Sequence, residues 1–254
     1  MSAPAPPAGY VRVTAGRCSA VVLADHEEDA RFLFAEGTLY EAAARDLAAR
    51  PMAGRGVAYA ITLPLSGSRV VVRHNRHGGL LAPLTRDLFL PPTRAPLELD
   101  VSLRLRATGV PTPEVVMYGL TAALGVFQRA DVVTREIEHG RDLSTYMAPE
   151  TSDDERAAAW DATRALVRAM NAAGARHHDL NVKNVLLAPA AHGLDAYVLD
   201  VDRVELGTPG AQEVARGNAA RLLRSARKWR DERGAVFDEG EIAALGDAGG
   251  SVAT

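Results

Sequence analysis

The spacing of apolar residues predicts strands in the first half of the chain. A loose alternation over Tyr10–Leu23 ends in a Val/Leu run, and short apolar runs bounded by Gly, Pro and Ser recur after residue 50. Runs of this length and composition are typical of strands. We therefore expect an antiparallel sheet with strands at Tyr10–Leu23, Val57–Leu63, Val70–Arg73, Val115–Leu120 and Leu124–Val133, and a hairpin turn at Pro64–Ser68.

Two segments between these strands carry helical signals. Asp25–Arg50 is acidic at its start, contains Arg at its end and is Ala-rich in between, which favours helix with a break near Gly37. Thr93–Thr108 is in conflict, because part of it alternates with the two-residue period of a strand. Thr93 as an N-cap, Pro96 in the first turn and Gly109 as a stop signal favour a helix, and we predict a helix there.

The second half of the chain is predicted to be mostly helical. Ser152–Glu155 is a capping box that begins a helix running to Ala173, with Gly174 as its stop. Further helices are expected over Ala211–Arg233 and Glu239–Leu245, after a polar connection at Thr134–Tyr146. The apolar stripes of the two long helices predict burial of Trp160, Leu166, Val167 and Met170, and of Leu222, Leu223 and Trp229.

This order of elements predicts an α+β fold with two lobes and a cleft between them. We expect an antiparallel-sheet lobe with one helix over residues 10–135 and a small, mostly helical catalytic lobe over residues 136–247. Residues 1–9 and 248–254 are expected to be disordered tails.

Composition narrows the class of protein. The single cysteine, Cys18, excludes a disulfide framework and a multi-cysteine metal site, and it suits a reducing compartment. A net charge of -3 argues against a dedicated nucleic-acid binder. The first nine residues lack the basic start and apolar core of a secretory signal. The most apolar stretch, Val115–Phe127, is too short to span a bilayer, so we expect any membrane contact to be peripheral.

Residues 177–203 contain the densest group of candidate functional residues. A polar segment from His177 to Asn184 precedes the apolar run Val185–Leu187, and a second apolar run, Ala196–Leu199, precedes an acidic tip that starts at Asp200. This pattern predicts a loop and a β-hairpin. Asp179 and Asn184 then lie at one end of the hairpin, and Asp200 returns to that end.

Such a convergence is what phosphoryl transfer requires. Hard oxygen ligands hold Mg²⁺ against the phosphates, and a separate carboxylate orients the attacking hydroxyl. The spacing matches the kinase catalytic loop H-x-D-L-x-x-x-N, with Asp200 in the place of the metal-binding Asp of D-F-G. The alternative is a polar hairpin whose Asp and Asn residues only cap turns. Three such residues in register around one hairpin favour the functional interpretation.

The phosphate-binding elements are less distinct. The chain has two lysines, Lys183 and Lys228, and a Walker-type loop needs its own Lys after the glycines, so P-loop ATPases are excluded. Gly54 and Gly56 precede a strand, where glycine amides can approach phosphates closely, although a plain turn is an equally common use of this spacing. The basic loop that includes Arg76 and His77 suits anionic groups, or it is a solvated turn.

Several stretches together resemble the small bacterial lipopolysaccharide kinases, specifically the 3-deoxy-D-manno-octulosonic acid (Kdo) kinase family. The resemblance covers roughly residues 50–230 in order, and the basic loop and the Asp-x-Asp-Arg ending are its family-specific parts. The stretches are Gly54–Gly56, Val72–Leu80, Thr93–Ala95 with Glu98, Gly109–Pro113, Ala130–Thr134, His177–Asn184, Leu199–Arg203 and Asn218–Ser225.

The resemblance implies a protein-kinase-like fold that binds ATP between its lobes. Asp179 is then the catalytic residue that accepts the proton of the attacking hydroxyl, and Asn184 and Asp200 hold Mg²⁺. Arg73 takes the place of the usual strand-three Lys and pairs with Glu98. Arg in place of Lys departs from general kinases, because a planar fork and a point charge orient phosphates differently. The remaining cofactor-binding residues are Gly54 and Gly56.

The implied function is ATP-dependent phosphorylation of a Kdo hydroxyl on a lipid A precursor, at the cytoplasmic face of the bacterial inner membrane. Arg76, His77 and the arginines of Arg221–Arg230 are candidates for holding this anionic acceptor, although most arginines on such a helix form a solvated face. Alternatives are a heptose kinase, an aminoglycoside- or choline-type kinase, and a nucleotide-binding pseudokinase. Aminoglycoside- and choline-type kinases usually have a larger helical region after the metal-binding Asp than this chain provides.

Three residues need separate comment. His178 stands where the family usually has a small residue, and Lys183 where a His is expected; both flank the predicted base and bear on acceptor choice. Asp202 is either a second metal ligand or a partner for Arg203, and the ion pair is slightly favoured.

Overall fold

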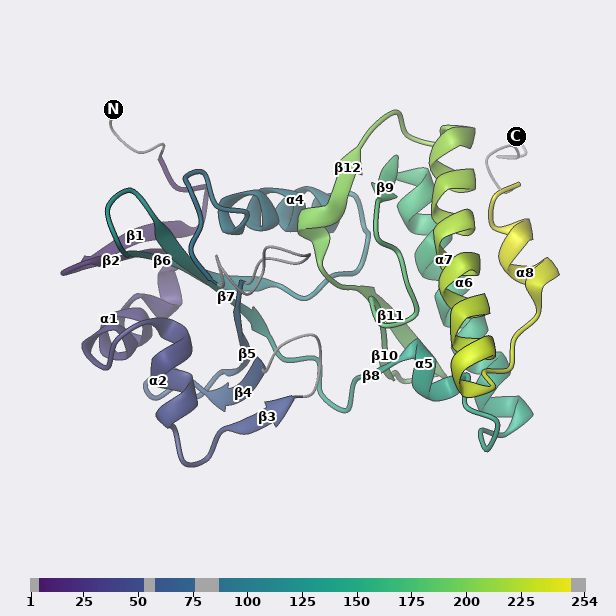
Figure 1. Ribbon diagram of the computed structural model, residues 1–254, viewed down its shortest axis with the longest axis horizontal. Coiled ribbons are helices and arrows are strands. Elements are labelled where there is room, and N and C mark those ends of the chain that lie inside the picture. Colours follow the sequence, from purple (N-terminus) through teal and green to yellow (C-terminus); the bar gives the residue numbers. More distant parts are fainter. Residues whose placement is uncertain (1–4, 53–57, 76–86, 248–254) are drawn as a thin grey trace. The chain divides into compact units, whose positions relative to one another are not determined.

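The computed structural model describes residues 5–52, 58–75 and 87–247, which form two compact units (Figure 1). The first unit comprises the described residues up to Asp100 together with Glu114–Glu136. The second comprises Val101–Pro113 and the described residues from Ile137 onward.

The first unit is built on a seven-stranded antiparallel sheet with strand order β1-β2-β6-β7-β5-β4-β3. Its strands are β1 (Tyr10–Ala15), β2 (Cys18–Leu23), β3 (Arg50–Met52), β4 (Ala58–Thr62), β5 (Arg69–His74), β6 (Val115–Ala122) and β7 (Gln128–Arg135). The predicted antiparallel sheet is confirmed. Tyr10–Leu23 forms two strands rather than one, because the chain turns at Gly16, where φ is +57°. Strand β7 begins at Gln128 rather than at Leu124, and the edge strand β3 was not predicted.

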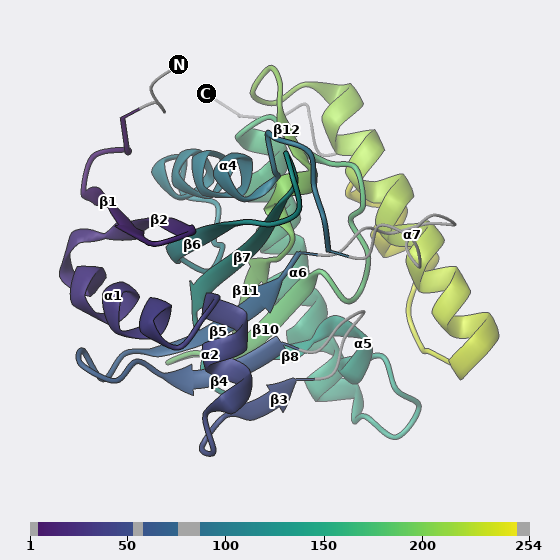
Figure 2. The ribbon, with the colours of Figure 1, turned by 60° about the vertical axis from the view of Figure 1, so that its left-hand side comes forward.

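Helices α1 (Glu27–Ala35) and α2 (Leu39–Arg45) cover one face of this sheet (Figure 2). Their buried side chains share a core with alternate residues of the strands: Leu33 and Phe34 of α1, Leu39 and Ala43 of α2, and Val22, Val70, Val72 and Val133 of the sheet. Gly119 of β6 permits this approach, since a Cβ there would lie 2.8 Å from the Leu39 side chain. The predicted helix break is confirmed at Gly37. The lobe description with a single helix is wrong, because α1 and α2 are both present.

The segment Thr93–Thr108, in which strand and helix signals conflict, is helical, as predicted. Helix α4 (Ala95–Ala107) begins with the Glu98 N–H donating to the Arg94 carbonyl at 2.9 Å. Thr93 is therefore not the N-cap that the sequence suggested; its buried hydroxyl has no hydrogen-bond partner within the described residues. The two-residue alternation does not describe its burial, since Glu98 and Ser102 are buried next to Leu99 and Val101 while Leu97 is 48% exposed.

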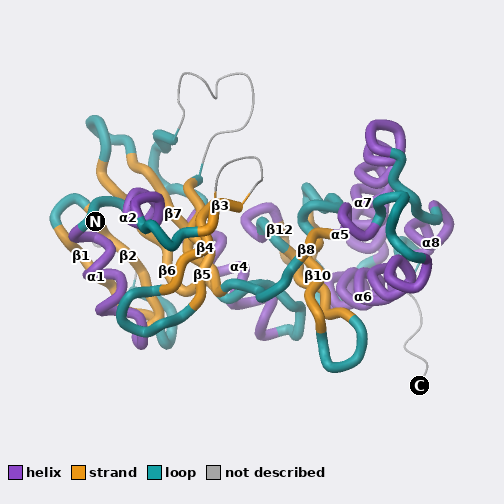
Figure 3. Tube along the Cα trace, turned by 90° about the horizontal axis from the view of Figure 1, so that it is seen from below, coloured by secondary structure: helices purple, strands orange, loops and turns teal. Residues whose placement is uncertain are grey.

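The second unit is mostly helical, with short strands (Figure 3). Its helices are α5 (Leu143–Tyr146), α6 (Asp153–Ala172), α7 (Gln212–Arg233) and α8 (Glu239–Ala244). One sheet has the order β11-β10-β8, from Leu194–Val198, Val185–Pro189 and Arg141–Asp142; a second pairs β12 (Val204–Leu206) with β9 (Ala175–His177). Ser152 and Glu155 form the predicted capping box of α6.

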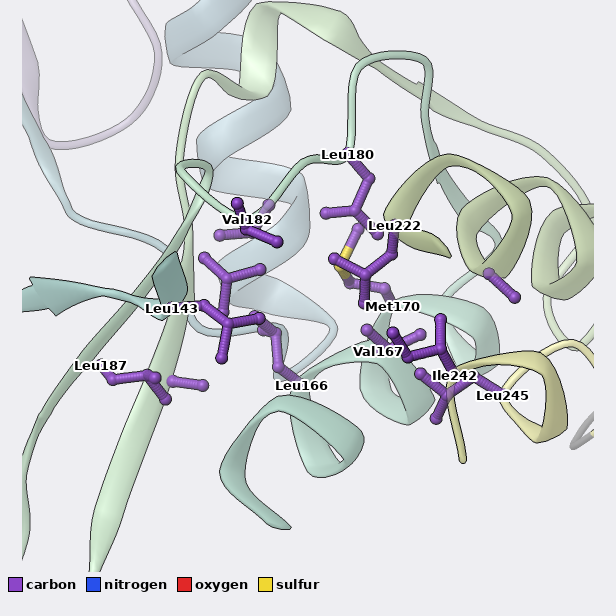
Figure 4. Packing of buried hydrophobic residues seen from close by; sticks show 14 of the residues in the cluster. Leu143, Leu166, Val167, Met170, Leu180, Val182, Leu187, Leu222, Ile242 and Leu245 are labelled. Atoms are coloured by element: carbon purple, nitrogen blue, oxygen red, sulfur yellow. The ribbon is translucent and has the colours of Figure 1, made fainter. Parts of the chain in front are cut away.

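The core of the second unit lies between α6, α7, α8 and the hairpin β10–β11 (Figure 4). Leu166, Val167 and Met170 of α6 pack there with Leu222 of α7 and Ile242 of α8. The predicted stripe of α6 is confirmed. On α7 the prediction holds for Leu222, whereas Leu223 and Trp229 are only partly buried.

Candidate active site

The hairpin of the second unit brings two predicted ligands to one end. Strands β10 and β11 are antiparallel, with Val185 opposite Val198. The next pair outward is Asn184 and Leu199, where the Leu199 N–H donates to the Asn184 carbonyl at 2.9 Å. Asp200 follows directly, in the left-handed backbone region with φ +54°. Strand pairing therefore brings residues 184 and 200, which are far apart in sequence, to the same end of the hairpin.

Asp179 is joined to the same end by the Asn184 side chain. The Asn184 Nδ2 donates to the Asp179 carbonyl at 2.9 Å, and the Asn184 N–H donates to the Asn181 carbonyl at 2.9 Å. Because Nδ2 is used in this bond, Oδ1 is the atom of the Asn184 amide that can bind a cation. Asn184 is 7% exposed, so its orientation is held by surrounding protein.

His177 links the loop to the segment that carries Asp200. The Asp179 N–H donates to His177 Nδ1 at 3.1 Å, so Nε2 carries the proton and donates to the Leu199 carbonyl at 3.0 Å. The imidazole is fully buried, and burial lowers the pKa of His177 below 6.5. A neutral ring suits both bonds. In the sequence His177 was only a motif position, and its linking role was missed.

Three polar side chains of helix α7 form hydrogen bonds with the backbone of the catalytic loop and the strand before it. The buried Asn218 accepts a hydrogen bond from the His177 N–H at 2.9 Å and donates to the Ala175 carbonyl at 2.9 Å. Arg221 Nε donates to the His178 carbonyl at 2.5 Å, and its Nη2 lies 4.0 Å from Asp179 Oδ1. The Ser225 hydroxyl accepts from the Val182 N–H at 3.2 Å. The spacing of residues 218, 221 and 225 places all three on one helix face, which was the signal available in the sequence.

The first unit carries the second predicted pair. Arg73 on β5 forms an ion pair with Glu98 on α4 through Nη2 and Oε1. The Glu98 side chain is 5% exposed and that of Arg73 is 30% exposed, so the carboxylate is buried and the guanidinium reaches the surface. Gly54, Gly56, Arg76 and His77 lie outside the described residues.

Comparison with known proteins identifies the family. The model of the lipopolysaccharide kinase (Kdo/WaaP) family matches residues 47–239. The chain belongs to this lipopolysaccharide kinase family. It is therefore a kinase, a phosphotransferase that acts on a hydroxyl group, with a protein-kinase-like α+β fold.

Relatives of this lipopolysaccharide kinase bear a specific name. It is 34% identical over 226 residues to the 3-deoxy-D-manno-octulosonic acid kinase of Stenotrophomonas maltophilia strain R551-3, covering 86% of this chain and 84% of that one. It is 31% identical over 194 residues to the enzyme of the same name from Actinobacillus succinogenes, covering 74% and 78% of the two chains. Among solved structures it is similar to one of WaaP in complex with acyl carrier protein, with a TM-score of 0.49, 18% identity, and 87% and 94% of the chains covered.

The three residues that needed separate comment, His178, Lys183 and Asp202, have partners within the second unit. The His178 ring lies 2.9 Å from Glu205 Oε2, and the Lys183 Nζ donates to Asp142 Oδ2 at 2.9 Å. Arg203 Nε lies 3.7 Å from Asp202 Oδ2, which is the ion pair that the sequence favoured.

The arginines at the end of α7 are engaged in the kinase's own ion pairs. Arg227 and Arg230 both bind Glu239 on α8, at 2.5 Å and 2.6 Å. Two of the candidate acceptor-binding arginines thus hold α8 in place.

Two features are absent from the described residues. In those ranges no three His, Cys, Asp or Glu side chains are grouped so as to hold a metal ion by themselves. No helix within the described ranges is long and apolar enough to cross a bilayer.

Proposed function

We propose that this kinase transfers the γ-phosphate of ATP to a hydroxyl of Kdo on a lipid A precursor, in assembly of the lipopolysaccharide core. The observation that carries the proposal is the joining of Asp179, Asn184 and the Asp200 segment at one end of the β10–β11 hairpin, through the bonds of Asn184 and His177. The identity of the acceptor is supported by the name of the relatives at 31% and 34% identity.

Asp179 acts as the group that accepts the proton of the attacking hydroxyl. Its side chain is 38% exposed, so an acceptor can reach the carboxylate from solvent. Two amide groups, of Asn181 and Asn184, donate to its backbone carbonyl at 3.0 Å and 2.9 Å and fix its position. A general base must lie within hydrogen-bond distance of the proton that it removes. The hydrogen bonds of the loop hold Asp179 in the position from which it would meet the acceptor hydroxyl.

Asn184 and Asp200 fit a Mg²⁺ ion that is shared with the nucleotide. An amide oxygen and a carboxylate are hard ligands, and Mg²⁺ is usually bound by one or two protein groups plus substrate phosphates and water. When bound, the ion neutralises charge on the transferring phosphoryl group. In the first unit, we assign Arg73 to the phosphates of ATP, with Glu98 orienting the guanidinium.

The test offers radiolabelled ATP to the kinase with three acceptors in parallel: Kdo-lipid A precursor, heptosylated core and a generic protein. We expect label in the Kdo acceptor and not in the protein. Label in the heptosylated core alone would reassign the acceptor to heptose. No label in any acceptor, together with ATP binding that is independent of Mg²⁺ in a thermal shift, would identify a pseudokinase.

We also propose that the kinase works at the surface of the inner membrane, where its acceptor is anchored. The turn between β6 and β7 exposes Leu124 and Val126 by 76% and 69%, and Phe127 by 36%. Phe89 and Gln128 exchange two backbone hydrogen bonds of 2.8 and 2.9 Å, which places Leu90, 61% exposed, beside this turn. Exposed apolar groups gathered at one place mark surfaces that bind partners or membranes.

A liposome sedimentation assay tests the membrane proposal. The Leu124→Asp and Val126→Asp double variant is expected to lose several-fold in binding to anionic vesicles, because two apolar contacts with the bilayer are removed and two negative charges added. Leu65→Asp is the matched control, since Leu65 is 60% exposed elsewhere in the first unit. Equal binding of the double variant and the wild type would remove the turn from this role.

A further inference from the structure

A pocket of about 470 Å³ lies in the second unit beside the catalytic loop. Ligand sites for small molecules occupy roughly 300–1,000 Å³, so this volume admits a sugar. Lys183 of the loop forms one wall, Arg141 of β8 and the segment from Ser144 to Thr151 form another, and Trp229 and Arg233 of α7 complete it. Lys183 directly precedes Asn184, and neighbouring Cα atoms are about 3.8 Å apart, so this wall of the pocket belongs to the catalytic loop itself.

Three cations of the pocket are arranged around aromatic rings. Lys183 Nζ lies 5.0 Å from the centre of the Trp229 ring, and the Arg233 guanidinium lies 5.5 Å from the same ring. The Arg141 guanidinium lies 5.2 Å from the centre of the Tyr146 ring. The charge of Arg141 also acts on Glu155 across the pocket, since it helps to lower the pKa of that carboxyl group.

Lys183 also retains donor capacity. An ammonium group has three N–H donors, and one of them is directed to Asp142 Oδ2 at 2.9 Å. Its side chain is 52% exposed, so the remaining donors face solvent or the pocket. Together with Arg141 and Arg233, Lys183 gives the pocket positive groups from three different elements, which suits a carboxylate or a phosphate.

The rest of the lining suits hydroxyl groups. Glu150 and Glu155 contribute carboxylates, and Ser144, Thr145 and Thr151 contribute hydroxyls. Hydrogen bonds from Ser152 lower the pKa of Glu155, so its carboxylate is a hydrogen-bond acceptor at neutral pH. The pocket thus has cations that can bind an anionic group, carboxylates that can accept hydrogen bonds from hydroxyls, and an aromatic ring. This is the set of groups that binds a polyhydroxy acid. A simple anion would not need the acceptors, and an acyl chain would not need the charges.

We propose that this pocket is the acceptor subsite, which binds an acidic sugar through its carboxylate at Lys183, Arg141 and Arg233. The inference rests on the proposed function for the identity of the sugar acid. It gives a role to Lys183, which stands where the resemblance led us to expect a His.

Lysine footprinting tests binding without catalysis. The chain has two lysines, Lys183 and Lys228, so acylation of each by an amine reagent can be followed by mass spectrometry. Lys228, 67% exposed and 3.8 Å from Glu232, does not line the pocket and is the internal control. We expect free Kdo to protect Lys183 and not Lys228, and the uncharged methyl ester of Kdo to protect Lys183 several-fold less. Equal rates for Lys183 with and without Kdo, or equal protection by inorganic phosphate and by Kdo, would overturn the assignment to a sugar acid.

Kinetics of variants provide the second measurement. Lys183→Met is expected to raise KM for the Kdo acceptor by about tenfold, the effect of losing one charged hydrogen bond, while KM for ATP changes less than twofold. Arg233→Gln, on the opposite wall, should act in the same direction, and Lys228→Met should match the wild type. An unchanged acceptor KM in both pocket variants contradicts the subsite. Should the wild type fail to phosphorylate Kdo, the proposed function is wrong, and the footprinting alone decides whether the pocket binds the sugar acid.

Discussion

At Asp179 hydrogen bonds of the backbone hold the residue in place. Its N–H donates to His177, and its carbonyl accepts from the side chains of Asn181 and Asn184. Arg221 Nη2 lies 4.0 Å from the carboxylate oxygen Oδ1. A substitution of the carboxylate by an amide keeps these backbone hydrogen bonds available to the loop.

We expect Asp179→Asn to lower turnover by a factor of about 100 or more, because the amide cannot accept the proton of the attacking hydroxyl. ATP affinity should stay within a few-fold of the wild type. The measurement is kcat with the Kdo acceptor, beside nucleotide binding in a thermal shift. Asp195→Asn on β11 is the control, since this exposed carboxylate undergoes the same chemical change away from the hairpin end. Turnover close to that of the wild type would exclude Asp179 as the base.

At the scale of elements, α7 determines the shape of the catalytic loop. Asn218 is fully buried and has three hydrogen bonds of 2.9 Å, to the His177 N–H, the Ala175 carbonyl and the Asn171 side chain. These bonds tie α7 to β9 and α6, directly before the loop begins. Removing the amide leaves buried backbone groups without partners, and each such group costs about 1–3 kcal/mol.

Asn218→Ala is therefore expected to reduce the free energy of unfolding by about 2–4 kcal/mol. Urea unfolding followed by circular dichroism measures this change. Arg216→Ala, at an exposed position of the same helix, should change stability by about 0.5 kcal/mol or less. A loss for Asn218→Ala no larger than that of the control would show that water replaces the amide.

Elements with their own local signals could be predicted from the sequence. The hairpin after Asn184 was found because two apolar runs flank a polar turn, and α6 because its capping box and stripe agree. The helix at residues 95–107 was predicted although its apolar residues alternate as in a strand, because the residues at its two ends favour a helix. Strands β3, β9 and β12 were missed: each has three residues and exists only through pairing with a distant partner, such as Arg50 with Ala60. The roles of His177 and Asn218 were missed for the same reason, because their partners are far away in sequence.

At the scale of the whole molecule, two buried histidines make the units respond to pH in opposite directions. In the first unit, burial alone would lower the pKa of His74, but its hydrogen bonds to Asp131 Oδ1 at 2.5 Å and Asp87 Oδ2 at 3.1 Å raise that pKa above 6.5. Arg129 also faces Asp87, at 2.8 Å, and the Tyr40 ring lies 5.1 Å from the imidazole. Both ring nitrogens lie within hydrogen-bond distance of carboxylates, an arrangement that favours the imidazolium form of His74. In the second unit, burial lowers the pKa of His177, which is neutral.

The signs of these shifts give a prediction for stability. A raised pKa contributes stability that is complete below pH 6.5 and is lost as the pH rises through the folded-state pKa of His74. A lowered pKa contributes stability that is present above pH 6.5 and is lost as the pH falls towards the folded-state pKa of His177. We therefore expect the first unit to lose stability on the alkaline side of pH 6.5, and the second unit on the acid side.

Hydrogen exchange resolved by peptide between pH 5 and pH 8 separates the two effects, after correction for the intrinsic exchange rate. Protection of β5 and β7, beside His74, should decrease as the pH rises above 6.5. Protection of β9 and the loop after His177 should decrease as the pH falls below 6.5. His74→Gln, which cannot become charged, should abolish the alkaline trend in β5 and β7 and leave the trend around His177 unchanged. If protection in both regions moved in the same direction with pH, the charge states assigned to the two imidazoles would be wrong, because an imidazolium held by two carboxylates and a neutral ring held by a backbone amide and a carbonyl cannot share one pH dependence.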